Sequence, residues 1–226
     1  MAGAPANPRE RYRQQVRDEI KGHAWTQIAD TGASALSLNA IAKLMGLSGP
    51  ALYRYFANRD ELITELVLDA YRDLADVARA AAESAAPEER LAELATAIRR
   101  WALANPHRYL LIYGTPVPGY TAPPEATAIA SSIMELLVTA YTRLTTHRSP
   151  WPAQLALEHH LADHREWAGG ASEHAAHAAL TFWTRVHGVL SLELAGHFTG
   201  MGFDPALLYA AEVESVTSRP PRSRRT

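Results

Sequence analysis

Apolar residues recur every three or four positions along most of this chain, and the strict alternation of a half-buried strand is nearly missing. In the first part of the chain Val16, Ile20, Ala24 and Ile28 are four residues apart, which predicts one helix ending at Gly32. This periodicity, repeated toward the C-terminus, predicts an all-α fold.

Two short helices and one long helix are predicted next. Ser37 is a candidate N-cap for the first short helix, which Gly46 closes, and Ser48 is a candidate N-cap for the second. Asn58, followed three residues later by Glu61, has the pattern of a capping box and predicts the start of a long helix over 58–80. The apolar stripe of that helix is Leu62, Leu66, Ala70, Leu74 and Val77.

The rest of the chain predicts six more helices and one long loop. The loop is 114–124, whose glycines and prolines exclude a helix. The helices are expected at roughly 87–104, 106–113, 123–147, 152–167, 172–198 and 205–217. We therefore expect an N-terminal domain over 1–60 that begins with an arm carrying Arg9, Arg11 and Arg13, a C-terminal domain over 61–217 with the helix 58–80 as the connector, and a disordered basic tail over 218–226.

The second short helix has an unusual composition, in the sequence LSGPALYRYFANRDEL over 47–62. Leu52 and Phe56 are four residues apart and can share a buried face, which leaves Tyr53, Arg54 and Tyr55 on the outside. No acidic residue occurs between Leu47 and Asn58. Two short helices with a tight turn have helix-turn-helix proportions, and in such a unit the second helix enters the DNA major groove. The exposed hydroxyls and guanidinium suit phosphate oxygens and a guanine edge.

Composition and charge agree with a nucleic-acid partner for the front of the chain. Of 226 residues 47% are hydrophobic and 20% charged, as in globular proteins. Residues 1–60 carry 8 basic and 5 acidic side chains, whereas 61–226 carry 14 and 19. There is no cysteine, no apolar run long enough for a membrane span and no secretory leader, so we expect a cytoplasmic protein with no membrane partner.

The order of these helices, together with GLSGPALYRYFANRDEL, resembles the DNA-binding domain of the TetR family of transcriptional regulators over about residues 9–75. The resemblance implies that Tyr53 and Tyr55 hold backbone phosphates and that Arg59 adds a positive charge at a place usually filled by lysine. Small residues at 49–51 offer few base readers, which moves specificity toward Arg54, close backbone approach and DNA shape. The full set of expected DNA-binding residues is Ser37, Asn39, Ser48, Gly49, Pro50, Ala51, Tyr53, Arg54, Tyr55 and Arg59.

The C-terminal half resembles a subset of that family with a Trp-x-x-x-His-Gly pattern, present as Trp183, His187 and Gly188. The resemblance implies a ligand pocket and a homodimer interface, which we place at 172–217 because the 172–198 helix is apolar on more than one side. Each aromatic residue of the pocket could instead be ordinary core. The expected pocket residues are Trp101, Tyr109, Tyr113, Met134, Leu137, Tyr141, Trp183 and His187.

An enzyme is the alternative interpretation. His159, His160 and His164 lie together in LEHHLADHREW, and two of them have zinc-ligand spacing, although no third ligand is evident. No phosphate-binding loop or nucleophile elbow occurs, so we expect neither catalysis nor a metal or other cofactor. The favoured hypothesis is a homodimeric repressor that binds a (pseudo)palindromic double-stranded operator and is released by a small-molecule effector.

Overall fold

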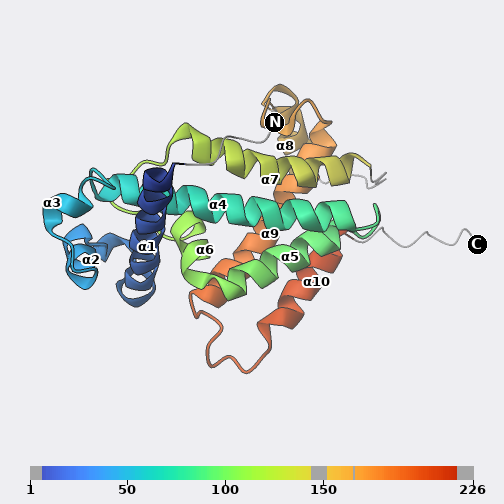
Figure 1. Cartoon of the computed structure of the whole chain (residues 1–226). Helices are drawn as coiled ribbons and strands as arrows, with labels where there is room; N and C mark the ends of the chain where they lie inside the picture. The colour runs from blue at the N-terminus through green and yellow to red at the C-terminus, as the bar shows by residue number, and fades with distance from the viewer. Residues whose placement is uncertain (1–6, 144–151, 165, 218–226) are drawn as a thin grey trace, which may run out of the picture. The chain divides into compact units, whose positions relative to one another are not determined.

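The computed structural model describes residues 7–143, 152–164 and 166–217, and every regular element within these ranges is a helix (Figure 1). The helices are α1 (Pro8–Thr31), η1 (Ala33–Ala35), α2 (Leu38–Leu44), α3 (Gly49–Leu52), α4 (Arg59–Ser84), α5 (Arg90–Ala104), α6 (Pro106–Tyr113), α7 (Pro124–Thr142), α8 (Pro152–Asp163), η2 (Glu166–Ala168), α9 (Glu173–Leu194) and α10 (Pro205–Thr217). The predicted all-α fold is confirmed.

Several helix limits differ from the predicted ones. The 172–198 helix ends early, at Leu194, and α8 ends at Asp163 rather than at 167. The last residues of the predicted 123–147 helix and the tail 218–226 lie outside the described residues. None of the described helices is both long enough and apolar enough to span a membrane.

The contacts divide the chain into two compact units. Unit 1 contains the described residues of Met1–Ala70 together with His107–Pro124, and unit 2 contains those of Tyr71–Pro106 together with Glu125–Thr226. The boundary crosses α4, so this helix contributes its first half to one unit and its second half to the other. The domain limits expected from the sequence, at residues 60 and 217, stay a prediction.

Unit 1 forms around the apolar stripe of α1. Ile20 and Ala24 of this helix are buried, as the four-residue spacing predicts, and so are Leu52, Phe56 and Leu62. Asn7 begins α1 with a complete capping box. The 114–124 loop closes the unit through Val117, which is buried, and through a hydrogen bond of 3.2 Å between the hydroxyls of Tyr120 and Thr64 of α4.

Unit 2 forms around α9, in which Phe182, Val186 and Leu190 are buried. α10 lies along α9 and also touches α5 (Figure 1). Arg99 of α5 forms a two-pronged ion pair with Glu193 of α9, with 2.8 Å between Nη2 and Oε1. This bidentate geometry fixes the direction in which α5 approaches α9.

Candidate nucleic-acid interface

The turn between α2 and α3 has the geometry that the sequence predicts. The Ser37 side chain accepts a hydrogen bond from the Ala40 amide, so it caps α2 as expected. Gly46 follows with a φ of 66°, a left-handed conformation that glycine adopts without a steric penalty. Ser48 occupies the N-cap position of α3, but its side chain makes no capping hydrogen bond. The exposed Ser48 side chain is therefore not used by the helix start that it precedes.

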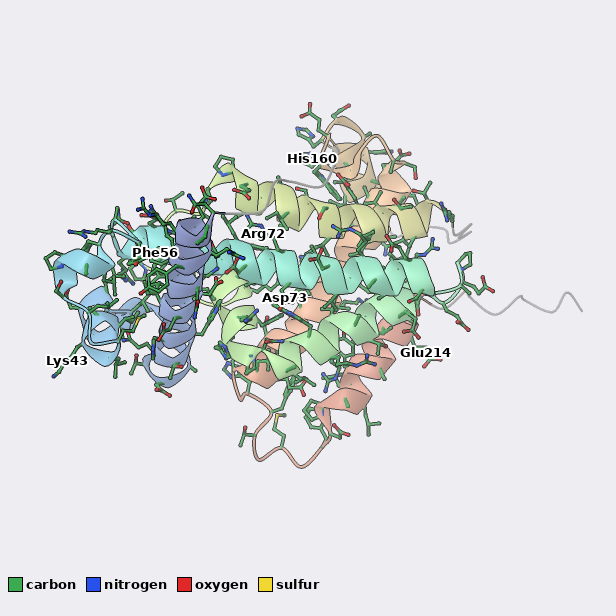
Figure 2. All side chains as sticks on the ribbon, in the orientation of Figure 1. Lys43, Phe56, Arg72, Asp73, His160 and Glu214 are labelled. Carbon is green, nitrogen blue, oxygen red and sulfur yellow. The ribbon has the colours of Figure 1, made fainter. Side chains whose placement is uncertain are left out.

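α3 is shorter than the predicted helix, because regular geometry stops at Leu52 and the chain continues as turns. The amide of Phe56 still donates to the carbonyl of Leu52, at 3.3 Å. Both side chains are consequently buried within unit 1, and Phe56 points toward α1 (Figure 2). The predicted Leu52–Phe56 anchor is confirmed, although a turn rather than a helix brings the second residue to it.

The side chains between the two anchors lie at the surface. Tyr53 is 45% exposed, Arg54 is exposed and Tyr55 is half-buried. The α3 side of the interface is flat, since Gly49 and Ala51 are small and half-buried and only Pro50 is exposed. With this arrangement the backbone of α3 could approach a DNA groove closely. The three larger polar side chains, Tyr53, Arg54 and Tyr55, lie next to that backbone.

α2 adds its first turn to the same surface. Asn39 is exposed, and its Oδ1 lies 3.8 Å from the position that a Cβ on Gly49 would occupy. Ser37 is half-buried, and its amide donates to the Gln27 side chain of α1 at 3.0 Å. The starts of α2 and α3 therefore meet at Asn39 and Gly49.

Two arginines of α1 hold the turn that carries these side chains. Arg17 donates from Nη1 to the carbonyl of Tyr55, and its guanidinium lies 4.1 Å from the centre of the Phe56 ring. Arg13 donates to the carbonyl of Arg54 at 3.3 Å. Neither role was expected from the sequence. Both bonds satisfy carbonyls at the end of a short helix, where intrahelical partners are missing.

The Arg17 contact belongs to a row of ion pairs between α1 and α4. Arg17 pairs with Glu65 at 3.3 Å, and Lys21, one turn further along α1, pairs with Asp69 at 2.8 Å. Burial lowers the pKa of Lys21, but the hydrogen bond and charge of Asp69, aided by Asp18, outweigh it and raise that pKa above its ordinary value. Lys21 is therefore charged throughout the neutral range and helps to fix α1 against α4.

Arg59 has protein partners. Its Nη2 donates to the carbonyls of Ala33, at 3.0 Å, and Ser34, at 3.2 Å, and the residue is half-buried. These bonds join η1 to the start of α4. Its expected phosphate contact stays a prediction. In addition, Arg59 has a structural role, because it connects η1 to α4 through these two hydrogen bonds.

The residues expected to bind an effector divide between the two units. Tyr109 and Tyr113 lie in unit 1 with ring centres 5.2 Å apart, and Tyr109 is fully buried there, which favours a core role for it. The other six lie in unit 2, where Leu137, Tyr141 and Trp101 are buried and Met134, Trp183 and His187 are half-buried.

Three of these unit 2 residues, Trp101, Tyr141 and His187, make polar or ring contacts with other residues of the unit. Trp101 donates from its indole to Asp73 at 2.9 Å, and the Tyr141 hydroxyl donates to the carbonyl of Val216 at 2.9 Å. The His187 ring lies 3.9 Å from the Trp183 ring, and burial lowers the pKa of His187 to about 3. His187 is therefore a neutral imidazole at physiological pH.

The three histidines in and just after α8 do not gather ligands for a metal among the described residues. His159, His160 and His164 are all exposed, and the rings of the latter two stack at 4.1 Å. Among the described residues, no three His, Asp or Glu side chains come together in a way that could hold a metal ion.

Comparisons with known proteins agree with the geometry. The model of bacterial regulatory proteins of the tetR family matches residues 23–66, and that of the tetracyclin repressor-like C-terminal domain matches residues 91–216. The HTH-type transcriptional regulator Rv1816 of Mycobacterium tuberculosis is 36% identical over 219 residues, which cover 91% of this chain and 92% of the relative.

Solved structures show the same similarity. The crystal structure of SCO4313, described as a regulatory protein, is 61% identical and superposes with a TM-score of 0.83, covering 93% of this chain and 98% of that one. The TetR family transcriptional regulator PfmR from Thermus thermophilus, at 18% identity and a TM-score of 0.56, covers 87% of this chain and 96% of its own. PfmR shows that the fold is shared.

Proposed function

This chain belongs to the TetR family of bacterial regulatory proteins, and from this premise we propose that it is a homodimeric repressor, released from its operator by a small-molecule effector. It is a DNA-binding transcriptional regulator. That it represses transcription, that its operator is twofold symmetric and that an effector releases it are the parts that we propose. As a regulator of transcription it would act where the DNA is, in the cytoplasm.

The observation that carries DNA binding is the turn from Tyr53 to Tyr55. It presents two phenol groups and one guanidinium at the surface, on a backbone that Arg13 and Arg17 hold from behind. Tyrosine hydroxyls donate to phosphate oxygens and set the register of a protein on the duplex. Arg54 is the side chain here that can fork onto a guanine edge, since Gly49, Pro50 and Ala51 before it carry no hydrogen-bonding side chain.

A twofold operator follows if the protein is a dimer. Unit 2 exposes large apolar side chains around α9 and α10, with Leu207 70% exposed and Met201 63% exposed, together with Leu192 and Phe203. Gly188 of α9 faces open space, since an added Cβ there would meet nothing within 4 Å. An apolar surface of this kind, with room for a close helix approach, is typical of a subunit interface. A second copy would place a second α3 on the next turn of the DNA.

Effector binding is proposed for unit 2, through Trp101, Met134, Leu137, Tyr141, Trp183 and His187. Aromatic and aliphatic side chains with a few polar atoms are the usual lining of small-molecule sites. The second half of α4 belongs to the same unit and its first half to unit 1. A ligand that shifts α4 therefore changes the position of α3, and two such shifts in a dimer alter the half-site spacing that the protein can bind.

The proposal is tested by selecting bound sequences from random DNA and then screening compounds for release. Recovery of a palindrome with half-sites one helical turn apart, bound by two chains, is the expected result. A compound that releases the protein must also bind more weakly when the operator is present, by the same factor. Enrichment of no sequence, with wild-type protein monomeric at micromolar concentration, would contradict the proposal.

A further inference from the structure

A groove runs between α5 and α10 in unit 2, separate from all eight residues expected to bind the effector. Its volume is about 660 Å³, which lies within the range of small-molecule sites, about 300–1,000 Å³. The α10 residues that line it extend from Ala206 to Thr217. At 1.5 Å per residue, this stretch of helix is about 16 Å long. The groove is therefore elongated rather than round.

Small side chains keep the groove open. Ala92 and Ala95 of α5 and Ala206 and Ala210 of α10 line it, and none of them can fill the space between two helices. Tyr209 holds the helices in place from within, because it is buried and its hydroxyl donates to the carbonyl of Ala95 at 2.7 Å. The groove is thus formed before any ligand arrives, which reduces the entropy that binding must overcome.

The two ends of the groove carry opposite charges. The end of α10, with Glu214, lies by the beginning of α5, so Arg100, near the end of α5, is at the other end (Figures 1 and 2). Arg99 lines the groove too, but Glu193 already neutralises it. Within the described residues Arg100 makes no ion pair and is exposed, so its charge is available to a ligand.

We propose that the α5–α10 groove binds a linear amphiphile with an anionic head group. The head pairs with Arg100, and the apolar chain lies over the four alanines toward Val213. Glu214 at the far end repels an anion and so sets the direction of the ligand. The length of about 16 Å suits an unbranched chain such as that of dodecanoate better than a compact ring system. Charge complementarity with Arg100 distinguishes this occupant from a second copy of the chain, which would need a flatter and more extensive apolar face.

The experiment is calorimetric titration of the full chain with dodecanoate below its micelle-forming concentration. Dodecyltrimethylammonium, which has the same chain and a positive head, is the matched probe, and both probes are also titrated into Glu214→Gln, which cannot hold the cation at the other end of the groove. We expect one saturable site per chain for dodecanoate and, in Glu214→Gln, at least tenfold weaker binding of the cation. Equal binding of the two probes to Glu214→Gln, or binding of dodecanoate without saturation, would overturn the proposal.

Two variants locate the site. Ala210→Leu fills the groove and Arg100→Gln removes the charge, and each is expected to weaken dodecanoate binding at least tenfold. Ala104→Leu is the control, since this exposed alanine at the end of α5 does not line the groove and lies outside the proposed subunit interface. Unchanged affinity in both groove variants would place the ligand elsewhere and refute the proposal. If Ala210→Leu instead separated dimers and left dodecanoate binding intact, the groove would be a subunit contact and the proposal would be wrong.

Discussion

Arg17→Met should destabilise unit 1 and misplace the DNA-binding turn. The substitution keeps the apolar stem and removes the guanidinium, so the loss of packing is small. The structure gives four lost interactions: the charged hydrogen bond to the Tyr55 carbonyl, the contact with the Phe56 ring, and the ion pairs with Glu65 at 3.3 Å and Glu61 at 3.9 Å. Their typical values are about 1.5–3 kcal/mol for the hydrogen bond, about 0.5–1 kcal/mol for the ring contact and about 0.2–1 kcal/mol for each ion pair.

These terms share one side chain and do not add in full, so we expect the free energy of unfolding to fall by about 2–3 kcal/mol. Urea unfolding measures it, and the midpoint should move while the slope stays constant. Arg13→Met is the matched control: its single bond, at 3.3 Å on an exposed side chain, predicts a loss of about 0.5 kcal/mol. Equal stability of the Arg17 and Arg13 variants would refute the idea that α1 holds the turn through Arg17.

Four further outcomes are expected. Arg54→Ala should cost about 1–3 kcal/mol per half-site on the operator and less on random DNA, and equal losses by gel shift would show that Arg54 touches only phosphate. Tyr53→Phe should weaken operator and random DNA alike, because a phosphate contact carries no sequence information. Arg59→Ala should lower the free energy of unfolding by about 1–3 kcal/mol, since the carbonyls of η1 lose their donor; unchanged urea unfolding would exclude the structural role. Leu207→Glu should give monomers with weakened operator binding, and sedimentation showing an intact dimer would move the interface away from α10.

Leu207 is a better site for that test than the apolar residues of α9. A sequence argument selects Leu190, because it lies on the long apolar helix expected in the interface. In the structure Leu190 is fully buried within its own chain, so a charge there would disrupt unit 2 whether or not a dimer forms. Periodicity shows that a residue is buried but cannot show whether its own chain or a partner buries it.

Which side chains between Leu52 and Phe56 are buried and which are exposed was largely predictable from the sequence. Leu52 and Phe56 are buried and Tyr53 and Arg54 are exposed because the Phe56 amide still bonds to the Leu52 carbonyl, so the segment keeps the four-residue spacing of a helix beyond the end of α3. The early end of α3 at Leu52 was not predictable in this way. The chain has to reverse before α4 begins at Arg59, and tertiary contacts decide where regular hydrogen bonding stops.

The role of Arg17 could have been found only in part. Arg13, Arg17 and Lys21 are four residues apart on α1, and so are Glu61, Glu65 and Asp69 on α4. Two complementary rows of charge on neighbouring helices predict ion pairs. The main acceptor of Arg17, however, is the backbone carbonyl of Tyr55. Every residue has such a carbonyl, so the sequence does not show which one Arg17 binds. The groove beside α10 is hidden for a similar reason, because an alanine that lines a cavity looks the same in the sequence as one that fills a core.

α4 is one continuous helix that contributes residues to both units. This helix has 26 residues, which at 1.5 Å per residue makes it about 39 Å long, and it contains neither proline nor glycine. Sharp helix kinks almost always occur at such residues or at inserted groups, so the sequence of α4 predicts no kink at proline or glycine. Its first half is fastened to α1 by Arg17 and Lys21, and α1 in turn holds the carbonyls of Arg54 and Tyr55. Within unit 1, a displacement of the first half of α4 is therefore expected to move the turn from Tyr53 to Tyr55 with it.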